Sequence, residues 1–196
     1  MIFMGLDFGI LYLLAVNVVG FLLFALSTLI RKKTSNIRID FLWMLTALLG
    51  GSVGTLISML VFDRKAEKEN MMSKVFLLCV VVVQTVIVLF LNGFHSPELN
   101  FDVIGFFSSN KFLIVYLIAI NILTFTVFAI DKYKAVKEKK RVRIVTLLSL
   151  SFFGGAVGGL AAMYLFRHKT KVNYFTVGLP LMIITHLILI FYIMNI

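Results

Sequence analysis

Long apolar segments alternate with short basic loops along this chain of 196 residues. Each apolar segment approaches or exceeds the roughly 20 residues that an α-helix needs to cross about 30 Å of hydrocarbon. None shows the period-two alternation of a membrane β-strand, so the pattern predicts an all-α integral membrane protein. The six segments lie at 9–30, 39–62, 75–94, 112–130, 144–166 and 174–195.

The composition supports the same class of protein. Apolar residues make up 61% of the chain and charged residues 14%, and a soluble domain of this length could not bury that much apolar surface. No Lys or Arg precedes the first segment, and Arg31, Lys32 and Lys33 follow it directly. This order of charges differs from that of a cleavable signal peptide and favours an N-terminus outside the cytoplasm.

The chain repeats itself at a shift of 104 positions. Residues 50–65 read GGSVGTLISMLVFDRK and residues 154–169 read GGAVGGLAAMYLFRHK, with eight of sixteen pairs identical. We therefore expect two tandem copies of a three-segment unit. The first copy would occupy residues 1–94, the second residues 112–196, and a non-cytoplasmic linker residues 95–111.

The basic residues decide how the segments are expected to cross. Loops 31–38, 64–74, 132–143 and 167–171 hold eighteen of the nineteen Lys and Arg residues. If all six segments cross, the two sides carry 11 and 8 basic residues, whereas a middle segment that dips and returns in each copy gives 18 against 1. The positive-inside rule prefers the dip, which predicts four spanning helices and two re-entrant, broken segments.

The glycines of the middle segments allow two readings. Gly50-Gly51 and Gly154-Gly155 lie where each segment would break, and glycine tolerates the backbone turn that a break requires. The pairs Gly50/Gly54, Gly154/Gly158 and Gly155/Gly159 also have the spacing that lets continuous helices pack closely. In that second reading all six helices span the membrane and the two copies are inverted.

Polar residues within or beside the apolar segments are the candidates for binding. Asn17 and Asn121 are paired by the shift, and buried amides need partners, either in a neighbouring helix or in a transported species. Asp131 and Lys132 can form a local pair at a helix end or belong to a site. Arg167-His168-Lys169-Thr170 can bind a phosphate or carboxylate, or anchor the helix at the membrane interface. The candidate substrate- or ion-binding residues are Gly50, Gly51, Gly54, Gly154, Gly155, Gly158, Asn17, Asn121, Asp131, Lys132, Arg167, His168, Lys169 and Thr170.

The second copy resembles a bacterial membrane family, domain-of-unknown-function family 1294 (DUF1294). The resemblance rests on FAIDKYKA at 128–135 and on FFGGAVGGLAAMYLFRHKTKVNYFTVGLP at 152–180, with a DKxxA stretch, a glycine pair and a terminal RHKT. In the first copy Ser27 and Thr28 replace the Asp-Lys pair, and DRKA from Asp63 replaces RHKT. The resemblance implies a membrane location and no established activity.

Other functional classes lack their residue patterns. The sequence contains no HExxH, GxSxG or phosphate-cradling Gly-Lys-Ser/Thr loop, so we expect no enzyme activity. Its three histidines have no ligand spacing, which predicts neither a metal nor another cofactor. The net charge of +10 is spread over short loops, where it favours anionic lipid headgroups over nucleic acid as partners.

These patterns favour a channel or transporter for an anion or small anionic metabolite, with its path along the interface of the copies. It would be a multi-pass protein of the cytoplasmic membrane with both termini on the non-cytoplasmic side, and its small size favours a homodimer. One alternative is a non-transporting scaffold that binds anionic lipid or a partner complex. Another is a membrane enzyme acting on an anionic or lipid-linked substrate.

Overall fold

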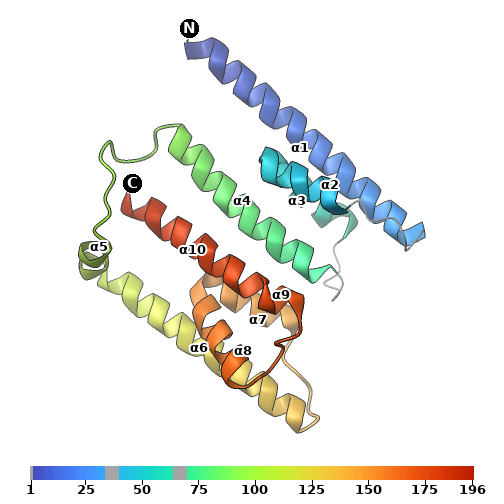
Figure 1. Cartoon of the computed structure of the whole chain (residues 1–196), viewed down its shortest axis with the longest axis vertical. Coiled ribbons are helices and arrows are strands. Elements are labelled where there is room, and N and C mark those ends of the chain that lie inside the picture. The colour runs from blue at the N-terminus through green and yellow to red at the C-terminus, as the bar shows by residue number, and fades with distance from the viewer. Residues whose placement is uncertain (1, 34–39, 64–69) are drawn as a thin grey trace. The chain divides into compact units, whose positions relative to one another are not determined.

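The computed structural model describes residues 2–33, 40–63 and 70–196, and their regular structure is entirely helical. Figure 1 shows the order of the helices along the chain. They are α1 (Ile2–Lys33), α2 (Asp40–Thr46), α3 (Ser52–Phe62), α4 (Met71–Leu91), α5 (Val103–Ser109), α6 (Lys111–Val136), α7 (Ile144–Leu150), α8 (Ala156–Leu165), α9 (Asn173–Thr176) and α10 (Gly178–Met194).

Six helical segments are long and apolar enough to cross a membrane, which confirms the predicted helical membrane class. Large apolar side chains are exposed along them, and α6 alone exposes Phe112, Val115, Ile118 and Ile122. Exposing so much continuous apolar surface to water would cost free energy, whereas contact with lipid chains does not. The chain is therefore a multi-pass membrane protein.

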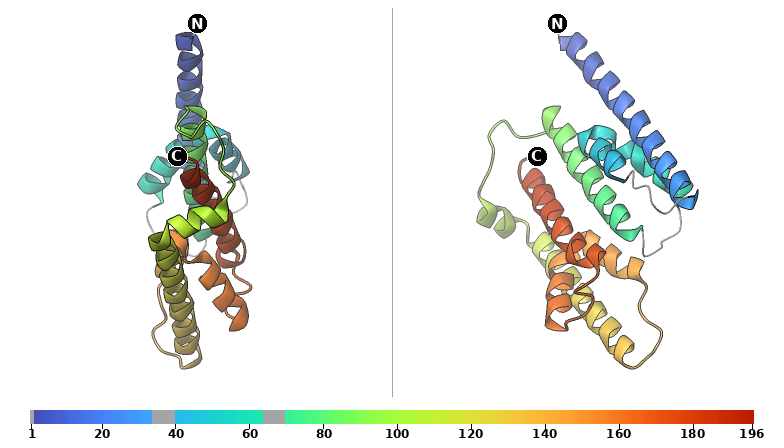
Figure 2. Two further views of the ribbon diagram at one scale, coloured as in Figure 1. Left: turned by 90° about the vertical axis from the view of Figure 1, so that its left-hand side faces the viewer. Right: turned by 45° about the vertical axis from the view of Figure 1, so that its right-hand side comes forward.

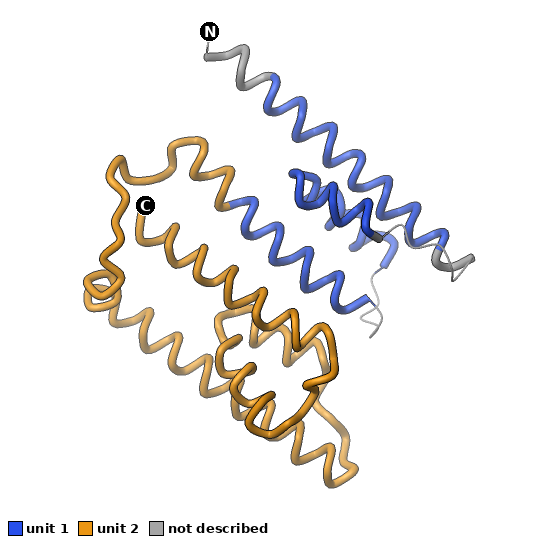
Figure 3. The backbone as a smooth tube through the Cα atoms, viewed as in Figure 1, with its two compact units in different colours: residues 1–85 blue, residues 86–196 orange. Residues whose placement is uncertain are grey.

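The chain divides into two compact units, residues 1–85 and residues 86–196 (Figure 3). Helix α4 runs across the border between them. The segment predicted as a linker contains the short helix α5, whose first turn is capped by Asp102: its Oδ1 accepts a 2.8 Å hydrogen bond from the Gly105 amide.

The middle segment of each unit is interrupted at its glycine pair. We call Ala47–Gly51 the first break, between α2 and α3, and Ser151–Gly155 the second break, between α7 and α8. Gly50 has φ 115° and Gly154 has φ 112°. Residues other than glycine are strained at positive φ, so the first glycine of each pair makes the turn possible.

In the first unit the two arms of the interrupted segment return along the same helix. The Trp43 ring on α2 lies 5.2 Å from the Phe24 ring on α1, and the Phe62 ring at the end of α3 lies 6.1 Å from Phe21. A straight helix from 43 to 62 would be about 28 Å long, yet its contacts on α1 are one helical turn apart. Helices α2 and α3 therefore form a hairpin, here named the first hairpin.

The second unit has the same geometry. Asp131 near the end of α6 contacts Val142, just before α7, and His168, just after α8. A straight helix from 142 to 168 would be about 39 Å long, so the ends could not meet at one residue. Helices α7 and α8 form the second hairpin, and Figures 1 and 2 show its arms as short helices joined at an angle. Its mouth is the pair of chain segments at Val142 and His168.

Each hairpin packs between two long helices of its unit. In the first unit a buried core joins α1, the first hairpin and α4; its members are Phe24, Trp43, Ala47, Met59 and Leu77. In the second unit α10 contacts both α8 and the second break. At the far end of α10, Tyr192 Oη donates a 3.0 Å hydrogen bond to the Phe94 carbonyl, which places this end beside the linker that precedes α6.

Candidate functional site

A single side-chain amide bridges the first break. Asn17 Nδ2 on α1 donates a 3.0 Å hydrogen bond to the carbonyl of Gly50, and its Oδ1 accepts a 2.7 Å bond from the amide of Gly54. Gly50 lies at the interruption and Gly54 in the first turn of α3. Asn17 therefore satisfies one backbone group within the break and one in the helix that follows it, where a membrane would offer no water to replace these bonds.

The same bridge recurs 104 positions later. Asn121 Nδ2 on α6 donates to the Gly154 carbonyl at 2.9 Å, and Asn121 Oδ1 accepts from the Gly158 amide at 2.7 Å. These bonds give both asparagines the interhelical role that the sequence offered as one of two alternatives.

The last glycine of each motif allows the helices to approach closely. A Cβ atom on Gly54 would lie well under 3.0 Å from the backbone oxygen of Asn17, and one on Gly158 equally close to that of Asn121. Both properties of the glycines therefore apply, to different residues: the first glycine makes the turn and the last permits close packing, although the packed helix is interrupted rather than continuous.

A tyrosine caps the carbonyl of the residue just before the first glycine of each break. Tyr12 Oη donates a 2.7 Å hydrogen bond to the Leu49 carbonyl, and Tyr116 Oη donates a 2.5 Å bond to that of Phe153. The sequence reasoning did not identify these tyrosines. The repeat could have pointed to them, because tyrosine occupies both positions at the shift of 104.

A third carbonyl is capped from the last long helix of each unit. Gln84 Nε2 on α4 donates a 3.0 Å bond to the Leu48 carbonyl, and His186 Nε2 on α10 donates a 2.7 Å bond to that of Phe152. Different residue types thus serve equivalent positions of the two breaks. Three consecutive carbonyls at each break therefore accept a hydrogen bond from a side chain. The carbonyl ends that follow α2 and α7 are thus poorly suited to coordinate a cation.

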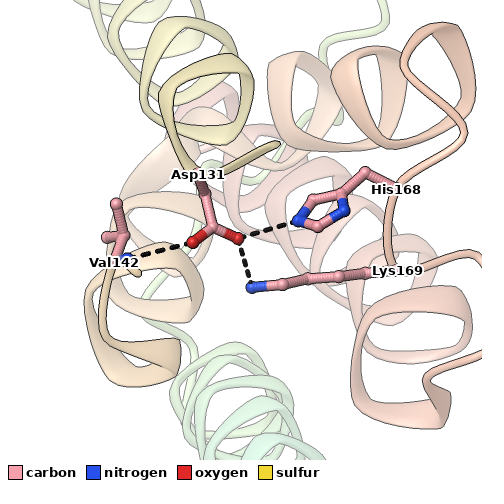
Figure 4. Close-up of polar contacts among 4 residues, drawn as sticks. All are labelled: Asp131, Val142, His168 and Lys169. Atoms are coloured by element: carbon pink, nitrogen blue, oxygen red, sulfur yellow. Dashed lines mark hydrogen bonds and ion pairs between the residues drawn. The ribbon is translucent and has the colours of Figure 1, made fainter. Parts of the chain in front are cut away.

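A charged cluster closes the mouth of the second hairpin (Figure 4). Asp131 is completely buried, and its Oδ2 lies 2.8 Å from Lys169 Nζ and 2.9 Å from His168 Nε2. The Val142 amide donates a 3.0 Å bond to the other carboxylate oxygen, Oδ1. One carboxylate therefore ties the start of α7 to the turn after α8.

The turn after α8 directs the two basic side chains toward this carboxylate. Arg167 and Lys169 have φ values of 44° and 63°, so the backbone reverses within three residues. The His168 amide donates a 3.0 Å hydrogen bond to the Met163 carbonyl, which ends the helix. Lys169 Nζ also lies 4.7 Å from the centroid of the Phe175 ring, a cation–π contact that holds the ammonium in place.

The structure brings the predicted site residues together in two groups. The glycines and asparagines lie at the breaks, and Asp131, His168 and Lys169 form the cluster at the mouth. Asp131 thus pairs with residues 37 and 38 positions further along the chain. Of the remaining candidates, Lys132 and Thr170 are half-buried and Arg167 is exposed.

The cluster has no direct counterpart in the described part of the first unit. Ser27 stands 104 positions before Asp131, and Arg64 and Lys65, the residues 104 positions before His168 and Lys169, lie outside the described residues. Asn70 Nδ2 donates a 2.5 Å hydrogen bond to Asp63 at the end of the first hairpin. Across the described ranges, no group of three or more His, Cys, Asp or Glu residues is placed to hold a metal ion.

Comparison with known proteins identifies the segment around the second hairpin. A family model described as "Protein of unknown function (DUF1294)" matches residues 121–175, from the bridging asparagine to the phenylalanine beneath Lys169. The chain is 41% identical over 75 residues to the uncharacterized protein YsdA of Bacillus subtilis (strain 168); the match covers 38% of this chain and 84% of YsdA. No solved structure matches the chain.

Proposed function

This chain belongs to the DUF1294 family, and we propose that it is a channel or transporter for an anion or small anionic metabolite. The observation that carries the proposal is the pair of interrupted helices, each bridged by an asparagine, at corresponding positions in the two units. Interrupted helices at matching positions of two halves are the feature that best indicates a substrate site in transporters.

The direction of the breaks favours an anion over a cation. The backbone dipoles of α3 and α8 place their positive ends at the breaks. The carbonyl ends of α2 and α7, which would otherwise attract cations, are occupied by tyrosine, asparagine, glutamine and histidine donors. The basic loops flank the hairpins at the end opposite the breaks and would raise the local concentration of anions there.

The proposed topology follows from the hairpins and the loop charges together. In each unit the first and last long helices cross the membrane, while the hairpin enters and leaves on the side of the basic loops. That side is the cytoplasmic side of the cell membrane by the positive-inside rule, with 18 basic residues against 1. The start of α1 and the end of α10 then lie on the non-cytoplasmic side.

Cysteine labelling tests this topology. In a Cys79→Ala background, single cysteines replace the exposed residues Lys137 and Lys171, which flank the second hairpin, and Glu98, which lies in the linker. A membrane-impermeant thiol reagent is expected to label positions 137 and 171 from the same side and position 98 from the other. Labelling of 137 and 171 from opposite sides would show that the segment spans and would refute the re-entrant arrangement.

Flux measurements test the transport activity. Purified protein in neutral-lipid proteoliposomes is expected to increase the flux of at least one anion among chloride, phosphate and small carboxylates above that of protein-free liposomes. Gly154→Ala places an alanine where the backbone has φ 112°, which is strained for any residue with a Cβ atom. This variant is expected to lower the flux at equal amounts of inserted protein. Gly9→Ala on α1 is the matched control, because no atom lies within 4 Å of its added Cβ.

One outcome of the flux experiment would refute the proposal. If no anion crosses faster than in protein-free liposomes although the protein is folded and inserted, the chain does not transport anions. A scaffold function then becomes the better explanation, and a specific observation favours it as the second candidate. Three carbonyls at each break and one amide beside it bind the protein's own side chains, as in a structural packing motif.

A further inference from the structure

The cluster at the mouth of the second hairpin is a complete anion-binding arrangement that the chemistry of the breaks does not use. Its donors are an ammonium, an imidazole and a backbone amide, which come from the segment just before α7 and the segment just after α8. They converge on a single carboxylate, which the protein supplies itself through Asp131. We call the three donors, on Val142, His168 and Lys169, the anion cradle.

We propose that the anion cradle binds the phosphate or carboxylate group of an external ligand by exchange with the Asp131 carboxylate. The inference rests on the proposed function, because it names the place at which the transported class of anion first binds. No covalent bond changes: the donors pass from one anionic group to another, and Asp131 is released from its place between the two ends of the hairpin.

Burial of the side chains indicates the route by which an anion would arrive. The Asp131 side chain is 0% exposed, whereas those of His168 and Lys169 are 14% and 15% exposed. These two donors therefore reach the surface while the carboxylate lies beneath them. An anion can contact the donors from outside before Asp131 has moved.

The surroundings of the cradle attract anions. The loop 132–143 contains seven Lys and Arg residues and a single acidic residue, Glu138. Arg167, next to the cradle, is exposed and can add a bidentate contact to an arriving phosphate or carboxylate. Such a field raises the rate and the probability of anion encounter.

A multidentate anion would use the donors better than Asp131 does. His168 and Lys169 share one oxygen of Asp131, because the other oxygen accepts from Val142. A phosphate group offers a separate oxygen to each donor, and charge-assisted hydrogen bonds of this kind are among the strongest in proteins. Exchange would also release α6, which carries Asp131, from the mouth of the hairpin, while the ligand would join the segments before α7 and after α8.

Thermal unfolding in the presence of inorganic phosphate tests the exchange. The whole protein in a neutral detergent is titrated with phosphate, with the ionic strength held constant by chloride. The unfolding midpoint of the wild type is expected to rise and saturate, and Lys169→Gln is expected to abolish the rise. Lys137→Gln, which removes an exposed lysine of the adjacent loop, is the matched control and should respond like the wild type.

Asp131→Asn provides the second arm, because it removes the competing charge and keeps the shape of the side chain. Its half-saturating phosphate concentration is expected to fall roughly tenfold or more relative to the wild type. The same titration with acetate tests a carboxylate group. Nanodiscs with and without phosphatidylglycerol test a lipid headgroup: a midpoint shift with this lipid alone would assign the cradle to a headgroup rather than a free solute.

The outcomes separate this inference from the proposed function. Equal responses of the wild type and Lys169→Gln, or no gain in affinity in Asp131→Asn, would overturn the cradle as an exchange site. A response of Asp131→Asn without any response of the wild type to phosphate, acetate or anionic lipid would also overturn it, leaving only a structural tie. Binding with the expected pattern but without flux would support the cradle and refute transport.

Discussion

Replacing Gly158 with Ala is expected to lower the free energy of unfolding of this protein by about 3 kcal/mol or more. The added Cβ would lie well under 3.0 Å from the backbone oxygen of Asn121, and a backbone atom cannot move aside as a flexible side chain would. Helices α6 and α8 would have to separate, which would also break the bond between Asn121 and the Gly158 amide. The loss is measured as a lower midpoint of thermal unfolding in detergent.

Two further variants make this result specific. Gly54→Ala should have a similar effect, because its Cβ would meet the backbone oxygen of Asn17 in the same way. Gly9→Ala should leave the midpoint unchanged or slightly higher, since the added methyl group meets nothing within 4 Å and alanine favours the helix. A midpoint for Gly158→Ala equal to that of Gly9→Ala would contradict the close approach of α6 and α8.

Replacing Asp131 with Ala is expected to cost about 3–5 kcal/mol of unfolding free energy in phosphate-free buffer. The change removes the carboxylate whose Oδ2 oxygen Lys169 and His168 share. It also leaves the Val142 amide without its acceptor. Breaking a buried ion pair from one side costs more than the pair itself contributes, because the remaining charge stays desolvated.

Asp102→Ala is the matched control for this loss of a carboxylate. Asp102 caps the short helix α5, and its removal should cost about 1 kcal/mol, the usual contribution of a helix cap. Thermal unfolding of the two variants under the same conditions compares them directly. Equal midpoints would mean that Asp131 makes no special contribution to holding the second hairpin.

The sequence was sufficient to predict the helical membrane class and the positions at which the middle segments break. Both depend on local properties: a run of apolar residues long enough for a bilayer, and the ability of Gly50 and Gly154 to adopt positive φ. The distribution of basic loops also favoured the fold-back that the contacts of Asp131 display in the second unit.

The partners of the polar residues could not be predicted in the same way. Asp131 meets His168 only because two helices turn back between them, and a charge pattern read along the chain places Asp131 nearest to Lys132. The capping role of Tyr12 depends on a free carbonyl that exists only once the helix is broken. Identity at the shift of 104 could have drawn attention to Tyr12 and Tyr116, but not to what they bind.

The asparagine bridges restrict how each hairpin can move. Because Asn121 binds Gly154 within the second break and Gly158 in the first turn of α8, the start of α8 cannot turn relative to the break unless one of these bonds breaks. The break is thus a fixed bend in the chain rather than a hinge. Any motion of the second hairpin must therefore begin at its mouth. The second break and the adjoining part of α6 would move together as one rigid body.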